Sequence, residues 1–293
     1  MGANKADDCQ EAQTTSESTQ DSEGETSVED MVWCLLAGSA DAEDDDAAEE
    51  ERIPSVPRPL LEGVEALRAE GICRLPVPLE AIEELESIAT ALLETKAWST
   101  VRGTESGEEV ALDSSWPLLR LHYSIGARHL FWLYAGDAEA LEPFGALAEV
   151  VAPSLAAVAS AAAGQLYFAA ASLVVLCAPG ARASEVHPHR DWEERALGPR
   201  SAFTVLTPLV LPAGSAGLEI FGPDKRSDGV AQYVRGEAIA FDNKLLHRTA
   251  PGSSPTRVLA SLSFAPSDPK LWPVAEKVLR AQTPHFYQRP LDV

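Results

Sequence analysis

The sequence predicts a mainly β fold in which helices pack outside a β core. Two observations carry this prediction. After Gln165, short runs of apolar, β-forming residues are separated by Gly- and Pro-containing turns, which is typical of a sandwich or barrel. Before Gln165, apolar residues recur at helical spacing instead. No Gly/Ser-rich linker divides residues 55–293, so we expect this part of the chain to form one domain.

The helical pattern is clearest before Gln165. In one segment, apolar residues from Ile82 to Leu93 fall on one side of a helix, and an earlier segment is closed by Gly71, a residue type that commonly ends helices. A third region is rich in alanine, and its prolines are expected to interrupt it because proline lacks a backbone donor. The predicted helices cover Leu60–Ala69, Leu79–Lys96 and the region 138–163, the last interrupted at Pro143 and Pro153.

The β-forming runs share a length of four to nine residues and end at turn-forming residues. One short strand is expected among the helices, and the others make up the C-terminal half. The predicted strands are Ile72–Leu75, Leu173–Leu176, Phe203–Leu211, Leu218–Phe221, Ala238–Phe241 and Val258–Phe264.

Acidic residues are concentrated at the start of the chain. The formal net charge is −22, and residues 1–51 contribute −16 of it through 17 Asp and Glu residues against Lys5. Residues 1–54 have too little apolar content to offset the entropy of ordering, so we expect a disordered acidic tail. One apolar island, Met31–Ala37, is compatible with a partner-binding helix or with a loosely packed segment, and nothing else supports a protein partner.

The composition disfavours several classes of function. The rest of the chain carries a net charge of −6 without a basic excess, which disfavours nucleic-acid binding. No apolar run reaches the roughly 18–20 residues of a membrane-spanning helix. The 4 cysteines form no CxxC pair, and the first residues lack the features of a secretory signal, so we expect a cytoplasmic location.

The segment Ser184–Trp192 carries the first candidate metal ligands. Pro188 disfavours a helix here, and in an extended chain residues two apart share a face, so His189 and Asp191 point the same way. One imidazole and one carboxylate suit a divalent metal such as Fe(II). Alone the motif is weak, because a surface turn with an ion pair between Asp191 and Arg190 would have the same sequence.

His247 is the candidate third ligand. It lies 56 residues after Asp191, far enough for intervening strands to return the chain to the same place. Two imidazoles and one carboxylate would leave open positions on the iron for a small-molecule substrate and molecular oxygen. His187 competes as a ligand because it shares a face with His189. We rank it lower, as a rim or supporting residue, because a His187–His189 pair would leave Asp191 without a role.

Arg257 begins an apolar strand ten residues after His247. A buried guanidinium is costly without an anion, and its planar fork matches a carboxylate. A dicarboxylate that chelates iron at one end and meets Arg257 at the other would explain both features, and 2-oxoglutarate is the obvious candidate. The competing interpretation is a structural ion pair with Asp242 or Glu237.

Residues 179–266 resemble the catalytic core of the phytanoyl-CoA dioxygenase family of Fe(II)/2-oxoglutarate-dependent oxygenases. One departure is that Gly222-Pro223-Asp224-Lys225 replaces the family's usual Gly-Ser-His, which leaves the substrate contacts there undefined. The matching segments, in order, are Pro179-Gly180, His189-Arg190-Asp191, Phe203–Leu209, Gly217–Pro223, Gly236–Phe241, His247, Thr249 and Arg257.

The resemblance implies a double-stranded β-helix (jelly roll) with helices packed outside. It also implies that His189, Asp191 and His247 bind Fe(II), that Arg257 binds the distal carboxylate of 2-oxoglutarate, and that Thr249 assists at that carboxylate. The implied reaction is hydroxylation of a C–H bond in a small-molecule or acyl substrate. Asp191 favours hydroxylation over halogenation, because similar iron halogenases have a small residue there. The alternative is a non-catalytic jelly-roll protein that binds a metabolite or a partner.

Overall fold

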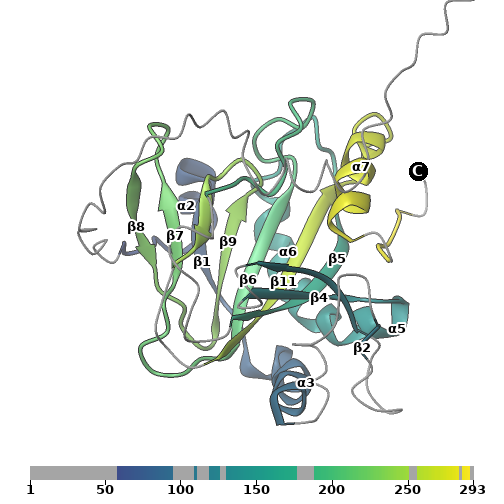
Figure 1. Ribbon diagram of the computed structural model, residues 1–293. Coiled ribbons are helices and arrows are strands. Elements are labelled where there is room, and N and C mark those ends of the chain that lie inside the picture. Colours follow the sequence, from purple (N-terminus) through teal and green to yellow (C-terminus); the bar gives the residue numbers. More distant parts are fainter. Residues whose placement is uncertain are drawn as a thin grey trace, which may run out of the picture.

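Two antiparallel β-sheets form the centre of the molecule (Figure 1). A computed structural model describes residues 58–94, 109–110, 119–125, 130–176, 188–250, 256–283 and 286–290. The larger sheet has the strand order β1-β9-β6-β11-β5-β4-β3-β2, and the smaller sheet has the order β10-β7-β8. The mainly β class with flanking helices and a jelly-roll core is therefore confirmed.

The strands vary from two to eleven residues, and the longest lie in the middle of the larger sheet. They are β1 (Ile72–Pro76), β2 (Glu109–Val110), β3 (Leu119–Ile125), β4 (Leu130–Ala135), β5 (Leu166–Leu176), β6 (Phe203–Val210), β7 (Leu218–Phe221), β8 (Ser227–Ala231), β9 (Glu237–Asp242), β10 (His247–Thr249) and β11 (Arg257–Pro266).

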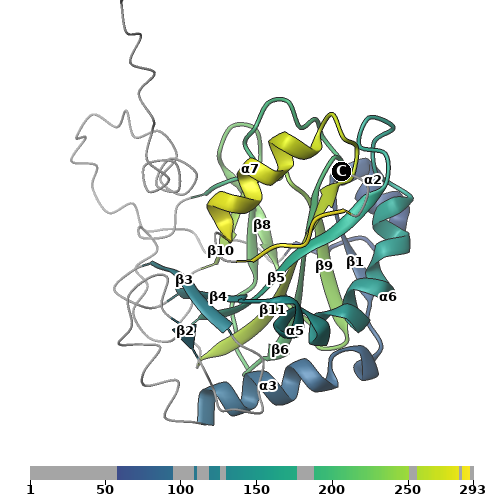
Figure 2. The same ribbon diagram turned by 90° about the vertical axis from the view of Figure 1, so that its right-hand side faces the viewer.

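Helices cover the outer face and the ends of the larger sheet. In both views α3 and α7 lie at opposite ends of the molecule, and α6 lies beside the larger sheet (Figure 2). The helices are α2 (Gly63–Glu70), α3 (Glu83–Glu94), α5 (Ala138–Leu141), α6 (Gly145–Ala156) and α7 (Trp272–Gln282), with short 3-10 turns η1 (Leu79–Ala81) and η2 (Glu142–Phe144).

Three apolar clusters hold these layers together. One lies between the two sheets and includes Ile220 of the smaller sheet and Phe241 of the larger sheet. A second packs α2, α3 and α6 against the outer face of the larger sheet, and a third packs α7 against one end. Full burial of each large apolar side chain contributes about 1.5–3 kcal/mol to folding stability. The packed region between the sheets therefore holds the polar residues at its edge in fixed positions.

The N-terminal half contains the expected outer helices, but it also contains strands that were not predicted. Strands β2, β3 and β4 belong to this half and extend the larger sheet beyond β5. Strand β5 also begins at Leu166, seven residues before the predicted start, because Ala169–Ala171 are poor β-formers by type yet are fully buried in the sheet. Strands β8 and β10 were not predicted, since both are short and partly polar.

Only one of the two predicted helix interruptions is observed. Pro143 lies in η2, between the end of α5 and the start of α6, as expected. Pro153 instead lies inside α6, which continues to Ala156. Pro153 is exposed, and so is Glu149 one turn earlier, so water can satisfy the carbonyl that loses its intrahelical donor.

Several predictions lie outside the described residues. These are the acidic tail 1–54 with the Met31–Ala37 island, the Pro179-Gly180 turn and the competing ligand His187. In the part of the chain that the structure describes, no helix has the length and apolar character needed to cross a bilayer.

Gly217, immediately before β7, is required by the close approach of two segments of the chain. A Cβ at this position would lie 2.0 Å from the carbonyl oxygen of Ala231. We expect Gly217→Ala to lower the free energy of unfolding by about 3 kcal/mol, because β8 must shift. The control is Gly145→Ala, whose Cβ would have no heavy atom within 4 Å and should change stability by less than about 1 kcal/mol. Urea denaturation measures both, and equal stability of the two variants would contradict the close packing.

Candidate metal centre

His189 and His247 are brought together by the backbone. The amide of each residue donates to the carbonyl of the other, both at 2.9 Å, so His189 forms an antiparallel bridge on the free side of β10. Residues that exchange both hydrogen bonds lie directly opposite each other, and their side chains share one face. The two imidazole rings accordingly have centroids 4.7 Å apart. The predicted extended conformation around Pro188 therefore places His189 beside a strand far along the chain.

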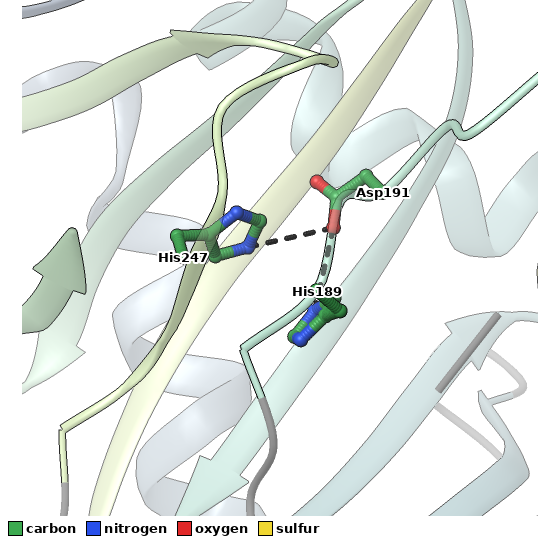
Figure 3. A group of neighbouring side chains, drawn as sticks. All are labelled: His189, Asp191 and His247. Atoms are coloured by element: carbon green, nitrogen blue, oxygen red, sulfur yellow. Dashed lines mark ion pairs between the residues drawn. The ribbon is translucent and has the colours of Figure 1, made fainter. Parts of the chain in front are cut away.

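Asp191 completes a cluster of three potential ligands (Figure 3). Its Oδ1 lies 3.7 Å from Nε2 of His189 and 3.5 Å from Nε2 of His247. Both distances exceed the usual length of about 2.7–3.2 Å for an N–H···O hydrogen bond. One donor atom from each of the three residues lies within 4.8 Å of the others. Two imidazoles and a carboxylate grouped in this way fit a divalent metal such as Fe(II).

The second carboxylate oxygen of Asp191 has a separate partner. Thr204 on β6 donates its hydroxyl proton to Oδ2, so Oδ1 remains on the side that faces the two histidines. The backbone carbonyl of Asp191 accepts a hydrogen bond of 2.7 Å from Nε2 of Gln282, at the end of α7. Neither contact was predicted from the sequence. They hold a residue that lies outside regular secondary structure.

His247 is oriented for ligation by its surroundings. Its Nδ1 lies 3.0 Å from the carbonyl oxygen of Leu245, which fixes the tautomer with the proton on Nδ1 and leaves Nε2 as the donor to a metal. The ring also packs against Phe241, with centroids 4.6 Å apart. Burial lowers the pKa of His247, and the attraction of Asp191 only partly opposes this effect. The imidazole is therefore neutral at pH 7, as a metal ligand must be.

The competing ion pair between Asp191 and Arg190 is not what the structure shows. Arg190 points away and donates from Nε to the carbonyl oxygen of Lys244 at 3.0 Å. Lys244 in turn donates from Nζ to the carbonyl oxygens of Trp192 and Glu194. These hydrogen bonds connect the loop that carries Asp191 to the turn before β10. The Asp191 carboxylate is thereby left facing the two histidines.

Arg257 lies at the start of β11 with only 3% of its surface exposed. Its Nη2 donates to the carbonyl oxygen of Ala250 at 3.2 Å, whereas its Nε is buried without a partner among the described residues. The predicted alternative partners are engaged elsewhere. Glu237 pairs with Arg74, and Asp242 accepts from the backbone amides of Arg200 and Lys244.

Tyr233, between β8 and β9, is a candidate residue that the sequence did not reveal. Its hydroxyl is buried and also lacks a partner among the described residues. Burial raises the pKa of Tyr233 to about 12, although the nearby charge of Arg257 works in the opposite direction. The Tyr233 hydroxyl and the Nε–H of Arg257 both lack an acceptor among the described residues, and they suit a carboxylate because a buried polar group without a partner is costly. No motif surrounds Tyr233, so only its position in the fold identifies it.

Two further side chains border the centre. Thr249 is half-buried and lies two residues after His247 on β10, so both side chains face the space between the sheets. Burial raises the pKa of the Tyr134 hydroxyl on β4, and the negative charge of Asp191 adds to this effect. That hydroxyl therefore stays protonated near the cluster.

Comparisons with known proteins show a likeness of fold only. No protein-family model and no curated protein matches the sequence. Among solved structures, AviO1 from Streptomyces viridochromogenes Tue57 is 21% identical over 71% of this chain and 94% of that chain, with a TM-score of 0.48. A prolyl-4-hydroxylase from Pseudomonas putida is 15% identical over 69% and 96%, with a TM-score of 0.43. SnoN, a non-heme alpha-ketoglutarate-dependent epimerase from nogalamycin biosynthesis, is 17% identical over 70% and 81%, with a TM-score of 0.46.

Proposed function

We propose that the protein is an Fe(II)- and 2-oxoglutarate-dependent oxygenase that hydroxylates a C–H bond of a small-molecule or acyl substrate. The order of motifs along the chain supports placing it with the phytanoyl-CoA dioxygenase family. The observation that carries the proposal is the convergence of His189, Asp191 and His247, together with an Arg257 whose buried Nε has no partner among the described residues. A purely structural role would explain neither feature.

His189, Asp191 and His247 would hold the iron. The Leu245 carbonyl keeps the proton on Nδ1 of His247, and Thr204 donates to Oδ2 of Asp191, so Nε2 and Oδ1 would be the ligand atoms. When bound, Fe(II) and 2-oxoglutarate supply the oxidising chemistry: one atom of O2 enters succinate as 2-oxoglutarate loses CO2, and the other enters the substrate C–H bond. The protein's contribution is to fix the ligands and to exclude bulk water.

Arg257 and Tyr233 would hold the distal carboxylate of 2-oxoglutarate. The Arg257 guanidinium is bonded to Ala250, three residues after His247. Since a strand rises about 3.3 Å per residue, this point lies about 10 Å from His247 along the chain. A five-carbon diacid together with the ligand side chains can span that distance. Thr249 lies between the two points and offers a hydroxyl on the same face.

The apolar cluster between the sheets includes Ile220 and Leu218, the cross-strand partners of His247 and Thr249. Leu218, Ile220, Phe241 and Leu259 are each about 1% exposed. Arg257 is itself only 3% exposed, so its attraction for a carboxylate would be strengthened, because charges interact more strongly at low dielectric constant. Phe241 of the same cluster packs against the His247 ring.

The proposal is tested by turnover of 2-oxoglutarate. Purified protein supplied with Fe(II), ascorbate and 2-oxoglutarate in air should release succinate even without the natural substrate, whereas His189→Ala and Asp191→Ala should not. Equal succinate release by all three proteins would remove the enzyme assignment. Metabolite binding without succinate release would favour the non-catalytic jelly-roll alternative.

Tyr233→Phe provides a sharper test of the diacid site. Its hydroxyl has no partner among the described residues, so its removal should not lower the melting temperature of the protein alone. The same change should weaken 2-oxoglutarate binding about tenfold, the worth of one hydrogen bond to a charged group. Isothermal titration with the Mn(II)-loaded protein measures the affinity. Wild-type affinity in Tyr233→Phe would exclude Tyr233 from the site.

A further inference from the structure

The loop that carries Asp191 is fixed to the rest of the protein by side chains. Residues 191–194 belong to no helix or strand, so backbone ladders do not position them. Loops of this kind are ordinarily more mobile than the elements they connect. Here the backbone carbonyls of Asp191, Trp192 and Glu194 all accept hydrogen bonds from side chains of other elements.

The C-terminal helix α7 supplies the contact nearest the metal centre. Gln282, the last residue of α7, donates from Nε2 to the carbonyl oxygen of Asp191 at 2.7 Å. One turn and a half earlier, Lys277 forms an ion pair of 2.9 Å with Glu194. Between these contacts, the Trp192 side chain is 1% exposed and belongs to the same apolar cluster as Trp272 and Leu279 of α7. The helix therefore holds this loop through both polar and apolar contacts.

Gln282 and Thr204 hold opposite ends of the same residue. Thr204 fixes the carboxylate of Asp191, and Gln282 fixes its peptide group. With both ends held, rotation about the Asp191 backbone can no longer swing Oδ1 away from His189 and His247. Removal of a group that orients a metal ligand in this way typically lowers metal affinity about 10–100-fold.

We propose that Gln282 is a positioning residue for the metal centre, through which the C-terminal helix sets the geometry of Asp191. This inference rests on the proposed function only in requiring that the three-residue cluster binds a divalent metal. Gln282 touches neither the metal ligand atoms nor the diacid site. Its effect passes through the peptide group of Asp191.

Cobalt(II) binding to the purified 293-residue protein tests the proposal without relying on activity. Gln282→Met keeps the length of the side chain and removes its donor, and should weaken Co(II) affinity about tenfold. Gln282→Leu, a second variant, should show the same loss. Arg280→Met is the matched control, because Arg280 lies on the same helix and contacts Glu276 and Tyr287 instead of the loop.

Three readings of the titrations are decisive. A loss in both Gln282 variants, with wild-type affinity in Arg280→Met and metal-free melting temperatures close to wild type, supports the proposal. Wild-type affinity in the Gln282 variants, or an equal loss in Arg280→Met, overturns it and leaves the proposed function standing. Failure of the wild-type protein to bind Co(II) overturns both proposals.

Discussion

Replacing Asp191 with alanine is expected to lower the affinity for Fe(II) or Co(II) at least a hundredfold and to abolish succinate release. The variant loses the only anionic donor of the cluster, and two neutral imidazoles bind a divalent metal much more weakly than a set that includes a carboxylate. Folding should be spared, because the Asp191 side chain is partly exposed and loses one hydrogen bond, that from Thr204. Metal titration and a coupled succinate assay measure the two effects.

Glu193→Ala is the control for Asp191→Ala. It removes the same charge two residues further along the chain, from an exposed side chain that is not in the cluster. It should retain wild-type metal affinity and turnover. If Glu193→Ala lowered metal affinity and turnover as much as Asp191→Ala does, the loss would come from removing a negative charge anywhere in this loop. The assignment of Asp191 as a ligand would then be wrong.

Arg257→Met is expected to weaken 2-oxoglutarate binding about a hundredfold and to leave metal affinity intact. Hydrogen bonds to charged groups contribute about 1.5–3 kcal/mol each, and every 1.4 kcal/mol is a factor of ten in affinity. Burial lowers the pKa of Arg257, which means that the environment disfavours its charge when no anion is present. A methionine side chain fills a similar volume and carries no charge to be buried. The free energy of unfolding should therefore stay the same or rise.

Arg248→Met makes a contrasting control nine residues earlier. Arg248 is also buried, at 6% exposed, but its Nε donates to Glu219 at 2.6 Å and its guanidinium lies over Phe221. Removing it would leave the buried carboxylate of Glu219 without this partner and should cost about 3–5 kcal/mol of stability. Binding of 2-oxoglutarate should survive. Titration calorimetry and urea denaturation of both variants would contradict the account if Arg257→Met lost stability and kept its affinity for the diacid.

Two members of the candidate metal cluster could be placed together from the sequence because they are close neighbours in the chain. His189 and Asp191 are two residues apart in an extended segment, which places them on one face whatever the rest of the fold does. His247 was a candidate because it lies 56 residues after Asp191, far enough for intervening strands to return the chain to the same place. The competing ligand His187 lies outside the described residues.

The supporting residues could not be predicted because they come from unrelated parts of the chain. Gln282 is 91 residues from Asp191 and ends a helix whose pattern signals only packing. Tyr233 follows β8, a strand whose sequence contains Ser, Asp and Gly and has little β character. Thr204 lies in a correctly predicted strand, but its contact with Asp191 depends on how the loop folds back.

A crystal structure of the protein grown anaerobically with Fe(II) and 2-oxoglutarate would test the central claim most directly. The account predicts one iron bound by Nε2 of His189, Oδ1 of Asp191 and Nε2 of His247, with the distal carboxylate of 2-oxoglutarate hydrogen-bonded to Arg257 and Tyr233. Iron bound elsewhere, or a diacid that does not reach Arg257, would contradict it.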